Sequence, residues 1–78
     1  MKLINVSAEF QLDGSVQVTR FNWNGRDYLV ESQGRQWQAE NGRHVLVSTP
    51  GGRMFELLYM PVDGRWFMAR SHTPPMAV

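Results

Sequence analysis

Apolar and polar side chains alternate along most of the chain, and this pattern predicts a succession of short β-strands. Between Leu3 and Leu12 every second residue is apolar. Val45 and Val47 share one face of residues 43–49, and residues 53–60 are the most apolar stretch. Such a pattern is typical of strands that turn one face toward a core. No stretch sustains the 3.6-residue spacing of a helix, although residues 31–40 could hold a short helical turn. The sequence therefore predicts an all-β fold.

The clearest local signal is the hairpin around Asn24-Gly25. Asn-Gly between two β-prone runs favours a type I′ turn, because both central residues then take a positive φ. This turn predicts a register in which Trp23 faces Arg26 and Phe21 faces Tyr28. One side of the resulting ribbon is aromatic, which indicates that this side packs on a core.

Further turns divide the rest of the chain. A three-residue loop, Asp13-Gly14-Ser15, would place Phe10 opposite Val18. The apolar positions of the second strand change from even to odd numbers near Thr19 and Arg20, which predicts a bulge or a sharp bend there. Gly34 either begins a loop or is a second bulge that lets the third strand continue to Ala39, and the bulge is the favoured interpretation. The remaining turns are predicted at Asn41-Gly42, Pro50-Gly51-Gly52 and Pro61-Val62-Asp63-Gly64.

These elements make a six-stranded antiparallel meander that curls into a small barrel or a strongly bent sheet. Residues 1–70 are predicted to form a single all-β domain. Residues 71–78, which include two adjacent prolines, are predicted to be a flexible C-terminal tail.

Composition narrows the class of protein. The chain has 78 residues, a formal net charge of +1 and no cysteine. The lack of cysteine favours a reducing compartment, and polar residues interrupt any apolar stretch near the start, so we expect a cytoplasmic protein with neither an export signal nor a membrane span. The near-neutral charge disfavours a protein that grips nucleic acid through its overall field, although a local patch stays possible.

The sequence carries no recognisable catalytic or metal-binding motif. His44 and His72 have no second histidine or cysteine at ligand spacing, so no metal or other cofactor is expected. Glu31 and Glu56 lie in predicted strands, but nothing in the sequence brings them together. We therefore expect a non-enzymatic domain.

Two groups of side chains are candidates for contact with a partner. Five of the seven arginines follow a glycine, so each of these opens a strand just after a turn and is interpreted mainly as a solubilising residue. Trp23 opposite Arg26 could instead form a cation–π pair beside a stacking platform, or Trp23 could belong to the core. Trp37 lies in a polar neighbourhood between Arg35 and Arg43. The candidate contact residues are Trp23, Arg26, Arg35, Trp37 and Arg43.

A pattern over residues 21–70 resembles a family of small bacterial domains of unknown function. It consists of Phe21-x-Trp23-x-Gly25-Arg26-x-Tyr28-x-Val30, then Trp37, then Phe55-Glu56-Leu57-x-Tyr59, then Trp66-x-Met68. Phe55 stands where the family's strand often has tyrosine, and the first twenty residues carry no match. Some members are similar to appendages of Y-family DNA-polymerase-like proteins. The resemblance implies a DNA-associated accessory role and brings no catalytic residues.

The leading hypothesis from the sequence is an accessory or interaction domain that binds a protein partner or itself, through an open strand edge or an aromatic patch. The alternative is weak binding of single-stranded nucleic acid through Trp23, Trp37 and the arginines. A small-molecule binder in the mouth of a barrel is a third possibility.

Overall fold

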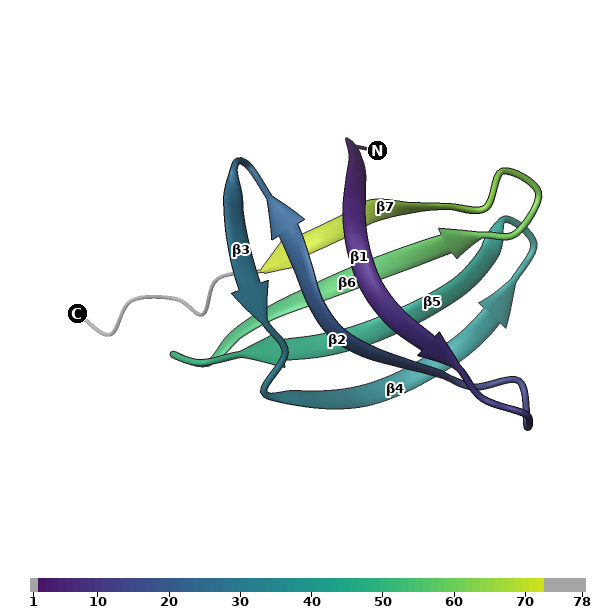
Figure 1. The fold of residues 1–78 in the computed structure, drawn as a ribbon, viewed down its shortest axis with the longest axis horizontal. Coiled ribbons are helices and arrows are strands. Elements are labelled where there is room, and N and C mark those ends of the chain that lie inside the picture. Colours follow the sequence, from purple (N-terminus) through teal and green to yellow (C-terminus); the bar gives the residue numbers. More distant parts are fainter. Residues whose placement is uncertain (1, 73–78) are drawn as a thin grey trace.

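The computed structural model describes residues 2–72, which form seven antiparallel β-strands joined by short connections. The sheet order is β3-β2-β1-β7-β6-β5-β4. The fold is all-β, as predicted, and the sheet curls into a half-barrel (Figure 1). The strands are β1 (Lys2–Phe10), β2 (Val16–Trp23), β3 (Arg26–Leu29), β4 (Ser32–Ala39), β5 (Gly42–Thr49), β6 (Arg53–Met60) and β7 (Arg65–His72).

The sheet curls because two stretches of chain change partners along their length. Residues 2–4 of β1 pair with β7, whereas residues 5–10 pair with β2. Between β3 and β4, the Val30 N–H donates to the Thr19 carbonyl and the Glu31 N–H donates to the Ser48 carbonyl. Each partner change forms a corner. As a result β1, β2 and β3 lie across one face of the layer formed by β4, β5, β6 and β7 (Figure 1).

The hydrophobic core fills the space between these two layers. Phe21 of β2 packs edge-on against Phe55 of β6, with ring centroids 5.0 Å apart. Tyr28 of β3 stacks on Phe21 at 5.3 Å, so the aromatic side of the predicted hairpin does face the core. The buried apolar residues of the core cluster are Ile4, Val16, Val18, Phe21, Val45, Val47, Phe55, Leu57, Trp66 and Met68.

The register predicted for the central hairpin is confirmed. Asn24 and Gly25 have positive φ values of 52° and 78°. Phe21 pairs with Tyr28 and Trp23 pairs with Arg26. The register between β1 and β2 shifts by one residue at Thr19, which is the predicted bulge and explains how Val18 and Phe21 can both be buried.

The register of the first hairpin is different from the prediction. Phe10 pairs with Val16 rather than with Val18, because the loop is longer than three residues. Within it the Gln11 N–H donates to the Ser15 carbonyl at 2.9 Å, and the Asp13 carboxylate accepts bonds from the Ser15 N–H and hydroxyl at 2.9 and 2.6 Å. Leu12 is therefore in the loop and fully exposed.

Two further boundaries differ from the prediction. The predicted third strand is divided at Val30 and Glu31, so the described residues form seven strands rather than six. The bulge predicted at Gly34 is present and lies within β4. The loop between β4 and β5 is Glu40-Asn41, one residue earlier than expected. Gly42 is the first residue of β5, and only glycine fits there because a Cβ would lie 2.1 Å from the Tyr59 carbonyl oxygen.

The last strand, β7, continues to His72, two residues past the predicted end at Arg70. From position 73 onward the predicted C-terminal tail lies outside the described residues.

Two glutamine side chains of β4 close the gap to β2. The Gln33 amide accepts a hydrogen bond from the Val18 N–H at 2.8 Å and donates to the Val16 carbonyl. The Gln36 amide accepts from the Val16 N–H at 2.9 Å and donates to the same carbonyl at 3.1 Å. These amides take the place of backbone partners where β3 is too short to cover the edge of β2. No pattern in the sequence predicts this role.

Candidate functional site

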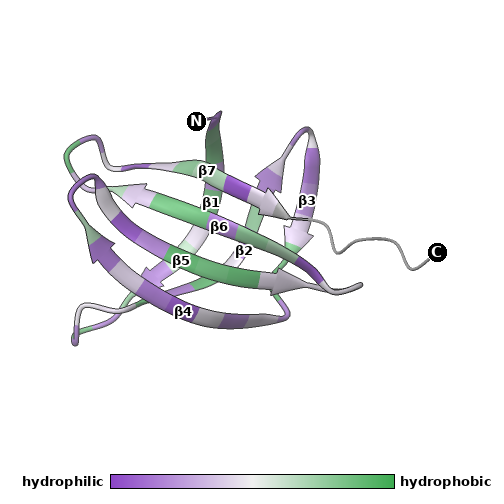
Figure 2. Cartoon of the chain, turned by 180° about the vertical axis from the view of Figure 1, so that it is seen from behind, coloured by the Kyte–Doolittle hydropathy of each residue, from purple (hydrophilic) through white to green (hydrophobic). Residues whose placement is uncertain are grey.

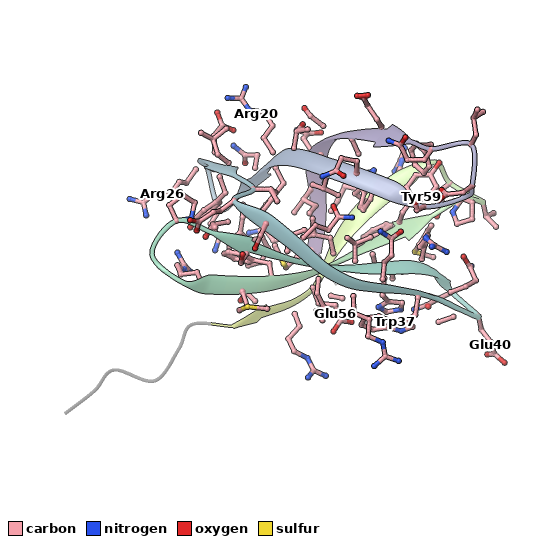
Figure 3. The ribbon with its side chains drawn as sticks, turned by 90° about the horizontal axis from the view of Figure 1, so that it is seen from below. Arg20, Arg26, Trp37, Glu40, Glu56 and Tyr59 are labelled. Atoms are coloured by element: carbon pink, nitrogen blue, oxygen red, sulfur yellow. The ribbon has the colours of Figure 1, made fainter. Side chains whose placement is uncertain are left out.

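The outer face of β4, β5 and β6 carries a cluster of aromatic and charged side chains. Trp37 of β4 pairs with His44 of β5, and their rings are nearly parallel with centroids 5.1 Å apart. Glu56 of β6 projects from the same face, on the side away from β1, β2 and β3 (Figure 3). The alternation of side chains along each strand places all three residues outside the core.

A short hydrogen bond fixes the position of His44. Its Nδ1 atom lies 2.8 Å from Glu56 Oε2, and the two side chains are 13% and 17% exposed. Its Nε2 atom lies 3.2 Å from Asn41 Oδ1. Because both ring nitrogens have an oxygen neighbour, the imidazole is held flat against the indole of Trp37. The pair therefore acts as a rigid support for Trp37.

Beside this cluster lies a recess with a cavity volume of about 390 Å³. The apolar surface comes from Leu46, which is half-buried, and from Met54, which is 39% exposed. Glu56 pairs in register with Arg70 of β7, so a carboxylate and a guanidinium border the apolar part. Figure 2 shows that the middle segments of β5 and β6 are hydrophobic and that most of β4 is hydrophilic. The recess is lined by Trp37, Leu46, Met54, Phe55, Glu56 and Arg70.

Of the predicted contact residues, the structure brings Arg35 and Trp37 together on this face. The Arg35 guanidinium carbon lies 5.3 Å from the centroid of the Trp37 ring. Arg43, in contrast, is half-buried and donates from Nε to the Gln36 amide oxygen at 2.9 Å. Arg43 therefore supports the link between β4 and β2 and does not join the outer face.

Trp23 and Arg26 belong to the other layer, in the β2–β3 hairpin. They pair in register, but the cation above the Trp23 ring is Lys2, whose Nζ lies 5.4 Å from the centroid. Arg26 is exposed and projects from the side of the molecule away from Trp37 (Figure 3). The five predicted residues thus do not form one surface.

Arg53, one of the five arginines that follow a glycine, is not the solubilising residue that the sequence predicts. Its Nη1 atom donates to the Tyr28 hydroxyl at 2.8 Å, and its guanidinium carbon lies 5.4 Å and 5.2 Å from the Tyr28 and Phe55 ring centroids. Arg53 is half-buried and ties β6 to β3. A cation held over two rings in this way contributes to the packing of the two layers.

Sequence reasoning missed most of the recess. His44 and Glu56 looked isolated, since they are twelve residues apart and only the register of β5 against β6 makes them diagonal neighbours. Their outward positions in the two alternating strands were the one available signal. Leu46, Met54 and Arg70 carried no distinguishing feature in the sequence.

Over residues 2–72 the structure has no group of three or more histidine, cysteine, aspartate or glutamate side chains placed to hold a metal ion. The same residues include no helix of the length and apolarity that crossing a membrane requires. Comparisons of the chain with protein-family models, with curated proteins and with solved structures find no match.

Proposed function

We propose that this chain is a non-enzymatic, cytoplasmic interaction domain that binds a protein partner through the recess beside Trp37. The observation that carries the proposal is the composition of the recess, in which a supported tryptophan and two apolar side chains are bordered by Glu56 and Arg70. Aromatic, methionine and arginine side chains are enriched at protein interfaces, and a bordering pair of opposite charges orients a partner. The expected ligand is a peptide segment that inserts an apolar side chain between Leu46 and Met54.

The placement of the arginines supports a protein partner over nucleic acid. Arg43 and Arg53 are engaged inside the molecule, and Arg20 and Arg26 lie far from Trp37 in the view of Figure 3. The Trp37 ring is already in contact with His44 and Arg35, so a base must displace one of them to stack. With a net charge of +1, the overall field adds little attraction for phosphates.

Weak binding of single-stranded nucleic acid remains the second candidate, because Arg35 and Trp37 together offer a cation next to an aromatic ring. The resemblance to domains appended to DNA-polymerase-like proteins agrees with this alternative. Nucleic-acid binding of this kind weakens steeply as salt rises, whereas an apolar contact does not.

The test is selection of peptides from a random phage-displayed library on the 78-residue chain, followed by mapping of the selected peptides by amide NMR. We expect shifts around Trp37, Leu46 and Met54, and at least a tenfold weaker affinity for Met54→Glu, because a charge then occupies the apolar recess. Val62→Glu is the matched control, since Val62 is 94% exposed in the β6–β7 loop and should bind as the wild type does.

Two outcomes contradict the proposal. Peptides that bind Met54→Glu as tightly as the wild type would place the interaction elsewhere. Failure to enrich any peptide, together with salt-sensitive shifts of Arg35 and Trp37 on addition of a mixed single-stranded oligonucleotide, would favour the nucleic-acid alternative.

A further inference from the structure

In the part of the chain that the structure describes, the edge of β4 away from β5 has no strand paired to its backbone, and only the side chains of Gln33 and Gln36 reach from β4 to β2. Among residues 2–72, β4 pairs with β5 alone, and it ends one side of the sheet. Figure 3 looks onto this edge, and the labelled Glu40 marks the point just past the C-terminal end of β4. The other terminal strand, β3, has only four residues, whereas β4 has eight. Natural proteins protect edges with short strands, prolines, charged side chains and bulges. Of these β4 has one bulge, at Gly34, and one charged side chain, Arg35, and the segment that follows the bulge is regular.

The register of β4 against β5 determines which backbone groups point outward. Ala39 and Gly42 flank a two-residue loop, so they form a hydrogen-bonded pair, and Trp37 with His44 forms the next one. The N–H and C=O groups of Gln36 and Gln38 therefore point away from β5. Gln38 is exposed, and these two residues offer a ready-made ladder for an incoming strand.

We propose that this edge pairs with β4 of a second copy of the chain, antiparallel and centred on Gln36. Gln36 then exchanges both backbone hydrogen bonds with Gln36 of the second copy, and Gln38 faces Gly34, where the absence of a side chain leaves room. Arg35 lies opposite Trp37 of the second copy in a pair without backbone hydrogen bonds, where cross-strand side chains come closest. This arrangement repeats the Arg35–Trp37 contact already made within each chain.

Neighbouring registers are less favourable. A shift of two residues toward the start of β4 places Arg35 opposite Arg35, a like-charge pair that destabilises the ladder. A shift the other way places Arg35 opposite Ala39 and Trp37 opposite Trp37, so a single aromatic pair replaces the two cation–aromatic contacts between the copies. Only the register centred on Gln36 sets both arginines opposite tryptophans, and this is the reason for assigning the edge to a second copy.

The paired edge would also alter the recess. The two sheets become continuous through β4, and Arg35 of each copy comes to lie beside Trp37 of the other. Each recess then receives a cation from the second copy at its border. The pairing itself does not depend on a ligand in the recess, so the two proposals can fail separately.

The experiment is sedimentation equilibrium of the 78-residue chain over a wide range of concentrations, with isotope-filtered NMR on a mixture of labelled and unlabelled protein. We expect a dimer with a dissociation constant in roughly the micromolar to millimolar range, little affected by salt. Filtered cross-peaks should connect Arg35 with the Trp37 ring of the other copy. Gln38→Pro should raise the dissociation constant at least about tenfold, because two outward N–H groups are lost per dimer.

A second variant keeps the test decisive if Gln38→Pro does not fold. Arg35→Glu should weaken the dimer, whereas Arg20→Glu, the same charge change at an exposed position of β2, should not. A chain that stays monomeric at every concentration overturns the proposal. So does a dimer that both β4 variants leave unchanged, or one whose filtered cross-peaks arise from β3.

Discussion

The two glutamine bridges between β4 and β2 lead to a sharp prediction about stability. In Gln33→Leu the side chain keeps a similar volume but loses its amide, so the Val18 N–H loses its acceptor. Val18 is 1% exposed, and water cannot readily replace that acceptor. The Val16 carbonyl keeps its bond from Gln36. One backbone donor is therefore left without a partner.

An unsatisfied buried donor costs about 1–3 kcal/mol. For a domain of this size each kcal/mol lowers the melting temperature by roughly 4–8 °C. Gln33→Leu should therefore lower the free energy of unfolding by about 2 kcal/mol and the melting temperature by roughly 8–16 °C. In the double variant with Gln36→Leu, both backbone groups of Val16 are orphaned as well, and the loss should be larger than either single loss.

Urea unfolding followed by tryptophan fluorescence measures the change, and amide hydrogen exchange at Val18 locates it. Gln17→Leu is the matched control, because Gln17 is exposed and lies next to Val18 in β2. This variant should change the free energy of unfolding by less than about 0.5 kcal/mol. The reasoning is refuted if Gln33→Leu is as stable as Gln17→Leu and the Val18 amide exchanges at the wild-type rate.

Two other predictions concern single positions. Gly42→Ala should destabilise the domain by roughly 2–6 kcal/mol, since φ is +148° and a Cβ would lie 2.1 Å from the Tyr59 carbonyl oxygen. Thermal melting measures the change, and Gly34→Ala is the control because the nearest atom to its Cβ would be 3.8 Å away. Equal losses of stability in the two variants would contradict the steric argument. Hydrogen bonds from the Ser15 hydroxyl and N–H lower the pKa of Asp13, so its ionised form contributes stability above the ordinary pKa of aspartate, and this contribution is lost as pH falls through the lowered value. An NMR titration should show the pKa of Asp13 rising toward its ordinary range in Ser15→Ala, and an unchanged pKa would show that these bonds are not its cause.

The sequence alone determined the local structure of the central hairpin and of the bulge before it. The Asn24-Gly25 turn fixed the register of its hairpin, because only a few residue types tolerate two successive positive φ angles. The change of apolar phase in β2 located the bulge at Thr19, since a one-residue shift is needed to keep both halves of the strand facing the core. The arginine–tryptophan pair of the candidate site was also visible, because Arg35 and Trp37 are two residues apart.

The tertiary structure decided everything that depends on which strands meet. The partner change at Val30 and Glu31 makes a corner, and that corner brings Gln33 close to the backbone of β2 and Arg53 close to Tyr28. The register of β5 against β6 joins His44 to Glu56 and so builds the support for Trp37. These contacts join residues twelve to twenty-five positions apart. They follow from the curvature of the whole sheet, which no local pattern of the sequence records.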